Sequence, residues 1–193
     1  MKKIIYFITL SSFLLSGNLY FSFDVQNDFE YHSDFTPDID SDNGFGNGSI
    51  LLGYDHTVYT KDQFMLNIGC NFSIKSADVE FDDELFDTKT DFYSIYIMPN
   101  FQLSDKLNLW ATLGHNSSRT TGDFTLRDGL LYGTGIRFLI TEYIGLGLGY
   151  NVHNAEADMS KYQDGQFDFT GSNSAIIHLK VKRISLDLFY KFN

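Results

Sequence analysis

Residues 144–152 read Ile-Gly-Leu-Gly-Leu-Gly-Tyr-Asn-Val, with a large apolar side chain at every second position. The same two-residue period runs through residues 64–74 and 184–192. Successive side chains of a β-strand point to opposite faces, so this period predicts strands with one apolar face. Weaker forms of the pattern cover residues 19–30, 50–59, 93–101, 107–113 and 130–140. The sequence therefore predicts an all-β fold.

The size and composition of the chain favour one ordered domain. The sequence has 193 residues, of which 43% are hydrophobic and 17% aromatic, and this is too apolar for a disordered chain. The formal net charge of −11 argues against a nucleic-acid partner, because phosphate binding requires clustered Lys and Arg. The single cysteine, Cys70, excludes an intramolecular disulfide.

The N-terminus has the pattern of a secretory signal peptide. Lys2 and Lys3 precede an apolar run over residues 4–15, and the small residues Ser16 and Gly17 follow it. The run is shorter than the roughly 20 apolar residues that a transmembrane helix needs. We therefore expect residues 1–17 to be a signal peptide and residues 18–193 to form the folded domain.

Strand length and loop length distinguish a membrane barrel from a soluble sandwich. The predicted strands run to about 10–12 residues, the length that a tilted strand needs to cross a bilayer, whereas sandwich strands usually have about 5–6. Short turns at one end of a barrel and long loops at the other are typical of outer-membrane barrels. We predict an eight-stranded antiparallel up-and-down transmembrane β-barrel, with a secreted sandwich as the alternative. Short joins lie near residues 60–62, 104–106 and 141–143, and long ones near residues 31–47, 75–91, 115–125 and 153–172.

The last predicted strand complicates the strand count. Apolar residues occupy odd positions at Ile177, Leu179 and Val181, and even positions from Ile184 onward. A bulge near residues 182–183 would shift the alternation within one strand, whereas a hairpin there would add a ninth strand. Single-chain bacterial barrels have even strand counts, so we predict eight strands with a bulge, and ten strands as the alternative.

The long loops hold most of the acidic residues and are a candidate binding surface. Asp38, Asp40 and Asp42 lie within the first long loop and are candidate ion or ligand contacts. Their spacing resembles a calcium loop, but an EF-hand needs glycine at its sixth position, and Asn43 stands there. We therefore predict no metal site and no cofactor.

The inward-facing positions predict a polar lumen. An eight-stranded barrel is just wide enough for side chains to fill it, so charged residues inside are expected to form a plug rather than a channel. A narrow pore is the alternative. Inward glycines near residues 133–149 would leave room for large side chains such as Trp110. The predicted network is Asp24, Asp55, Arg137, Asp187 and Lys191, with Asp28 and Glu30 also on the inward face.

One pair of residues has the types that catalysis uses. His115 and Ser117 are two residues apart, so they share a strand face, and the alternation directs this face towards lipid. The pair resembles that of outer-membrane lipid A deacylases, which implies Ser117 as nucleophile and His115 as base. Ser118 stands where that family has asparagine, and Asp123 and Asp128 are the nearest acids. We expect no enzymatic activity, and a lipid-modifying enzyme is the alternative.

The glycine-alternating residues 145–150 and the terminal residues 184–192 resemble small outer-membrane β-barrel domains of the opacity-protein and OmpA-like type. The resemblance implies an eight-stranded barrel in the bacterial outer membrane, with a C-terminal strand recognised by the insertion machinery. Asn193 follows the terminal aromatic residue, where the family usually ends. The expected role is envelope integrity or cell-surface adhesion. Expected partners are membrane lipid, lipopolysaccharide and an extracellular ligand.

Overall fold

The computed structural model describes residues 17–33, 44–45, 48–79, 88–120, 125–158, 163–164, 167–168 and 176–192. The predicted signal peptide, apart from Gly17, lies outside these residues. Within the described residues, no helix is long and apolar enough to cross a membrane.

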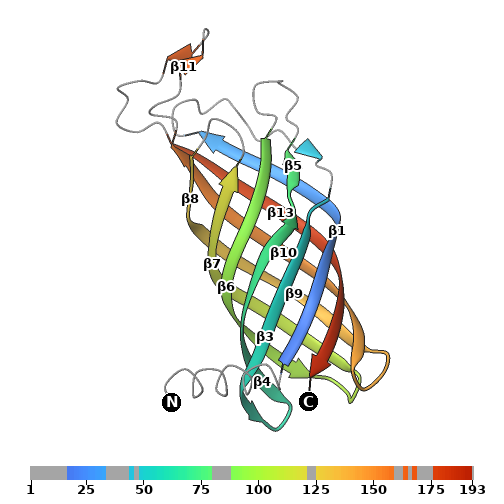
Figure 1. Cartoon of the computed structure of the whole chain (residues 1–193). Helices are drawn as coiled ribbons and strands as arrows, with labels where there is room; N and C mark the ends of the chain where they lie inside the picture. The colour runs from blue at the N-terminus through green and yellow to red at the C-terminus, as the bar shows by residue number, and fades with distance from the viewer. Residues whose placement is uncertain are drawn as a thin grey trace, which may run out of the picture.

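Eight long strands form the wall in the described part of the chain (Figure 1). Short strands accompany them near the long loops. The long strands are β1 (Gly17–Ser33), β3 (Ile50–Lys61), β4 (Phe64–Lys75), β6 (Thr88–Gln102), β7 (Leu107–Thr120), β9 (Gly129–Leu139), β10 (Ile144–Asp158) and β13 (Ile176–Phe192). The short ones are β2 (Gly44–Phe45), β5 (Ala77–Val79), β8 (Thr125–Arg127), β11 (Gln163–Asp164) and β12 (Phe167–Asp168).

The wall closes on itself. Each long strand pairs antiparallel with its neighbours in the order β13-β1-β3-β4-β6-β7-β9-β10, and β10 pairs with β13 to complete the ring. The β1–β13 ladder runs from Gly17 opposite Phe192 to Ser33 opposite Ile177. The prediction of a closed eight-stranded barrel is confirmed, and the ten-strand alternative is wrong.

The two ends of the barrel differ in their connections. Tight turns follow β3, β6 and β9, and they lie at one end of the barrel, the turn end. β1 begins at this end and β13 finishes there (Figure 1). In the first turn, Asp62 adopts a φ of 52°, a left-handed conformation that short Asp side chains tolerate better than most. The long connections leave from the other end, the loop end, as predicted.

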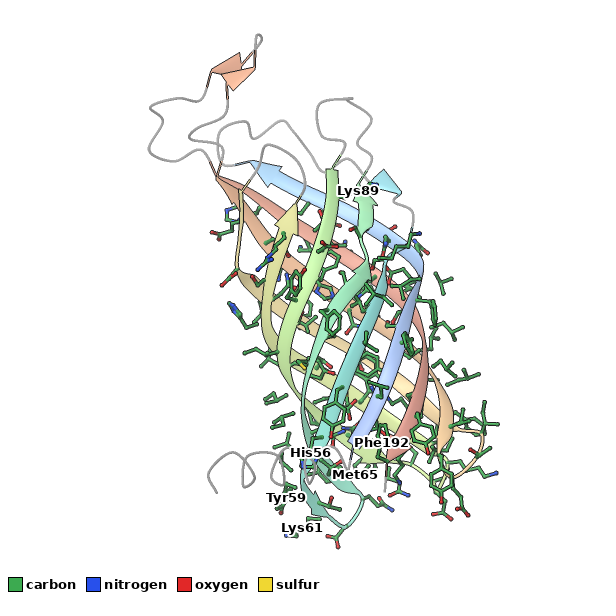
Figure 2. All side chains as sticks on the ribbon, viewed as in Figure 1. His56, Tyr59, Lys61, Met65, Lys89 and Phe192 are labelled. Atoms are coloured by element: carbon green, nitrogen blue, oxygen red, sulfur yellow. The ribbon has the colours of Figure 1, made fainter. Side chains whose placement is uncertain are left out.

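The outer face carries an apolar belt. Closure gives every wall strand a hydrogen-bonding partner on both sides, which lipid requires because it cannot hydrogen-bond an open edge. Aromatic side chains gather at the turn end, where the Tyr143 and Tyr190 rings stack 6.2 Å apart and Tyr59 lies 6.4 Å from Phe64. Figure 2 shows Tyr59, Lys61 and Phe192 at this end, and Lys89 near the other. Exposed belt residues include Phe21, Phe23, Ile68, Phe72, Ile95, Ile97, Leu109, Leu113, Leu130, Ile136, Leu146, Leu148, Leu186 and Leu188.

The predicted bulge in the last strand is wrong. In β13 the odd positions are buried from Leu179 through Phe189 without interruption. The alternation of apolar residues changes because Leu179 and Val181 belong to a buried apolar cluster inside the barrel at the loop end. Further along the strand, Arg183, Ser185 and Asp187 occupy the inward positions, and Leu186 and Leu188 face outward.

The bulge lies instead in β1. Asp24 pairs with Ser185 and Gln26 with Ile184, so Val25 is the extra residue, and its side chain is exposed. A one-residue insertion turns the following side chains to the other face. Asp28 and Glu30 therefore point outward, contrary to the prediction that they enter the lumen.

Candidate functional sites

A buried ion pair lies near the turn end of the lumen. The Arg137 guanidinium donates to Asp55 Oδ2 at 2.9 Å, and the Asp55 side chain is fully buried. Asn18 and Asn67 donate to the other oxygen of Asp55 at 2.7 and 2.6 Å. The cation also lies over the rings of Tyr20 and Phe189, at 5.4 and 5.3 Å from their centroids. Both oxygens of this carboxylate therefore accept hydrogen bonds, as a buried charge requires.

A second buried ion pair lies nearer the loop end. Arg183 pairs with Asp24, and both side chains are almost fully buried. The Ser49 backbone N–H and hydroxyl both donate to Asp24 Oδ2. Arg183 also donates to His153 Nε2 at 3.3 Å, while His153 Nδ1–H donates to Asn116 Oδ1 at 3.0 Å. These two contacts require a neutral imidazole with its proton on Nδ1.

Apolar side chains cover the second pair on its loop side. Phe92 lies 4.6 Å from the His153 ring, and the Arg183 guanidinium sits 5.9 Å from the Phe92 centroid. The cluster that contains Phe92 is composed of Leu51, Ala77, Phe92, Ala155, Leu179 and Val181.

A layer of large side chains separates the two ion pairs. Tyr20 and Tyr96 hydrogen-bond through their hydroxyls at 2.8 Å, and Trp110 and Met98 pack in the same buried cluster. The cavity at this level measures about 30 Å³, roughly the volume of one water molecule. Side chains therefore fill the lumen here. A larger cavity of about 110 Å³ lies at the turn end, lined by Arg137, Asn108 and Lys191 among others.

Not all of the lumen residues predicted from the sequence lie inside the barrel. Asp24, Asp55, Arg137 and Asp187 are inside, and Ser185 donates to Asp187 at 3.3 Å. Lys191 is exposed at the turn-end mouth. Arg183, His153 and Asn116 complete the loop-end network. The sequence does not assign Arg183 to the lumen, because a bulge predicted at residues 182–183 leaves the direction of this side chain undefined. Asp38, Asp40 and Asp42 lie outside the described residues.

Strands β1 and β13 extend past the apolar belt at the loop end. Between Val25 and Ile184 and this end, their outward positions carry charged side chains instead of apolar ones. Lys182 hydrogen-bonds Glu30, and Lys180 lies 3.5 Å from the same carboxylate. The Lys182 contact lowers the pKa of Glu30 and raises the pKa of Lys182. This rim faces the headgroup region or the aqueous phase beyond it.

A polar cluster interrupts the outer face near the loop end of β7. His115 Nε2 lies 3.0 Å from Asp128 Oδ2, with the two side chains 53% and 58% exposed. Ser117 also hydrogen-bonds Asp128. Of the two nearest acids in the sequence, Asp128 therefore contacts both His115 and Ser117, whereas Asp123 lies outside the described residues. Ser117 binds this carboxylate, whereas a nucleophile activated by His115 would need a hydrogen bond to the imidazole.

A local irregularity positions Asp128. Arg127 pairs with Glu156 and Leu131 with His153, so residues 128–130 oppose only two residues of β10. This is a bulge, and bulges redirect side chains. Gly129 is required here, because a Cβ at this position would lie 2.0 Å from the backbone oxygen of Asn154.

Comparisons with known proteins give matches among solved structures only. No protein-family model and no curated protein matches the sequence. Ail, the attachment invasion locus protein of Yersinia pestis, is 13% identical with a TM-score of 0.44, covering 90% of this chain and 99% of that chain. Neisserial surface protein A is 15% identical with a TM-score of 0.48, covering 90% and 97%. The outer membrane protease OmpT of Escherichia coli is 9% identical with a TM-score of 0.43, covering 92% and 97%.

The closed ring, the apolar belt and the contrast between short turns and long loops define a class. They are the features of a bacterial outer-membrane β-barrel, in which the turns face the periplasm and the loops the exterior. The chain is an outer-membrane barrel of eight strands with a side-chain-filled lumen.

Proposed function

We propose that this barrel is non-catalytic and that it functions at its loop end, in envelope integrity and in contact with extracellular ligands. The observation that carries the proposal is the filled lumen. Two buried ion pairs and the layer between them occupy the space that a transported solute would need. The surfaces that remain for contact with extracellular ligands are the charged rim and the acidic loops.

Charge complementarity gives the proposed ligand a chemistry. Residues 80–87 connect β5 to β6, and five of these eight residues are acidic. A cluster of one sign attracts partners of the opposite sign and speeds their association. The proposed ligand is therefore a basic peptide or a basic surface on another protein.

A loop exchange tests this proposal. Val79 and Thr88 are paired, so an Asn-Gly turn can replace residues 80–87 and close the hairpin. The exchange leaves Ala77, a member of the buried apolar cluster, in place. Barrels in vesicles should bind a fluorescent oligolysine peptide, and the exchanged barrel should bind much less.

A loop of unchanged length provides the matched control. Glu80→Gln, Asp82→Asn, Asp83→Asn, Glu84→Gln and Asp87→Asn together remove the charge but keep the length. The neutral loop should lose binding as the exchanged one does. Unchanged oligolysine binding in both variants would refute the loop proposal.

The filled lumen also predicts that the barrel does not conduct ions. We expect purified barrels in planar bilayers to show no conductance steps. Regular steps in the wild-type protein would support the narrow-pore alternative and overturn the plug.

A second candidate function is hydrolysis of an outer-leaflet lipid ester, favoured by the contact of Asp128 with both His115 and Ser117. In this candidate Ser117 leaves the carboxylate and becomes the nucleophile. Lipid A mass spectra of cells carrying wild-type protein and Ser117→Ala provide the test. Identical acylation in the two strains would exclude the enzyme.

The terminal strand is the proposed signal for barrel insertion. Phe192 packs against Tyr190, with ring centroids 4.9 Å apart. We expect Phe192→Ser to reduce the amount of barrel in the outer-membrane fraction. Recovery equal to wild type would argue against this signal.

A further inference from the structure

A polar cluster and an apolar groove lie side by side on the lipid-facing surface. The groove has a volume of about 850 Å³ and crosses the outer face from β3 over β4, β6 and β7 to the start of β9. Ile68, Ile95, Ile97 and Leu113 line it, and His115 lies among its lining residues. The belt faces hydrocarbon, so the groove is open to the acyl chains of membrane lipid.

The polar cluster is unusual for a lipid-facing surface. Ionisable side chains facing the bilayer are costly, and an ionisable residue at such a position indicates a functional site. His115 is half exposed beside Leu113 and Leu130, both of which are exposed apolar residues. Its hydrogen bond with Asp128 depends on the bulge that Gly129 permits.

The direction of the groove identifies the leaflet. His115 and Ser117 lie on the loop-end half of β7, whereas Leu113 lies one outward position nearer the turn end. A lipid with its chain along Leu113 and its head at Ser117 therefore has its head towards the loops. Because the loops face the exterior, this is a lipid of the outer leaflet.

The hydrogen-bonding groups identify the kind of headgroup. Asp128 accepts hydrogen bonds, Ser117 can donate and accept, and His115 can do either. One outward position further, Arg119 lies over the Tyr93 ring at 5.1 Å from its centroid. Asp91 is the cross-strand neighbour of Arg119 and accepts a hydrogen bond from Ser76. Positive and negative groups are thus mixed, which suits hydroxyl groups better than a purely anionic head.

We propose that this surface binds an outer-leaflet glycolipid, with an acyl chain in the groove and sugar hydroxyls at His115, Ser117 and Asp128. Arg119 binds a phosphate on the sugar. The proposal rests on the placement of the belt in the membrane and is independent of the loop-contact function.

Lipid retention tests the proposal directly. Wild-type barrel is placed in nanodiscs with equal amounts of lipid A and phosphatidylglycerol, extracted in mild detergent and examined by native mass spectrometry. We expect lipid A to be retained in preference to phosphatidylglycerol. Leu113→Trp, which fills the groove, and Asp128→Asn should each lower this preference about fivefold, the change that about 1 kcal/mol produces.

A matched variant separates this site from the rest of the belt. Leu188→Trp introduces the same ring on the exposed outer face of β13 and should leave the preference unchanged. Every variant should still shift on an unheated gel, which shows that the barrel has closed. Equal retention of both lipids by the wild type, or an equal loss in Leu113→Trp and Leu188→Trp, would overturn the proposal.

Discussion

The two ends of the lumen hold the same kind of ion pair in different surroundings. Asp24–Arg183 lies beneath an apolar cluster, whereas Asp55–Arg137 lies beside a cavity of about 110 Å³. Each carboxylate accepts hydrogen bonds from further donors as well as from its arginine. The hydrogen bonding of the two carboxylates is therefore alike, and their access to water differs. Among the described residues, apolar side chains cover the pair at the loop end, whereas a cavity adjoins the pair at the turn end.

Removing each arginine in turn is the strongest test of this difference. Breaking a buried ion pair by removing one partner costs about 3–5 kcal/mol, and we expect this cost for Arg183→Gln. We expect about 2 kcal/mol for Arg137→Gln, because water from the mouth can hydrate Asp55. Urea unfolding followed by the fluorescence of Trp110, the single tryptophan, measures both. Equal losses would show that the mouth does not hydrate Asp55.

The aromatic residues beside each ion pair should differ in the same direction. Phe92→Ala, within the buried apolar cluster, is expected to cost about 3–5 kcal/mol. Phe189→Ala is expected to cost about 1 kcal/mol less, because the site adjoins an existing cavity that can collapse or hydrate. The same unfolding measurement applies. A larger cost at Phe189 would contradict the proposed order.

The layer between the ends can be tested by adding a methyl group. A Cβ at Gly135 would lie 2.4 Å from the Trp110 ring and 2.3 Å from the Leu148 backbone oxygen, and overpacking of this kind costs about 1–3 kcal/mol. Gly147→Ala is the matched control, since its nearest neighbours would be 3.2 Å away. We expect unfolding to be shifted more by Gly135→Ala than by Gly147→Ala. Similar shifts would mean that Trp110 is not tightly packed.

The exposed rim should show the smallest effect. Lys182→Gln removes a surface contact worth about 0.5 kcal/mol or less. The contact lowers the pKa of Glu30 below its usual 4.5. Its stabilisation is therefore present above the unfolded-state pKa and is lost as the pH falls through the folded-state value. Unfolding of wild type and Lys182→Gln should differ at pH 7 and converge in acid; a difference that grows in acid would exclude this pair as its source.

The strands and turns were predictable because the wall repeats one rule. Each strand needs apolar residues at every second position, and this period is visible in one strand without knowledge of its neighbours. The period does not say which face is the inner one. Leu179 and Val181 face inward, whereas Leu186 and Leu188 face outward. The alternation of apolar residues therefore shifts by one position in β13, and the sequence alone attributes this shift to a bulge.

The irregularities were not predictable, because they depend on pairing. Val25 has nothing in its sequence context that marks it as an extra residue, and only the register against Ser185 and Ile184 reveals it. The bulge that directs Asp128 towards His115, 13 positions earlier in the chain, also depends on pairing. Gly129 was the available signal, since an isolated glycine within a strand pattern often marks a bulge.

The ladder between β1 and β13 has a consequence for folding kinetics. It joins Gly17 to Phe192, so the ring cannot close before β13 has been synthesised. Contacts between such distant residues form slowly, because the loop-closure entropy is lost before the contact forms. Until closure, β1 and β13 each present an unpaired edge that can join another chain. The barrel is therefore most prone to aggregate in the interval between synthesis of β1 and pairing of β13.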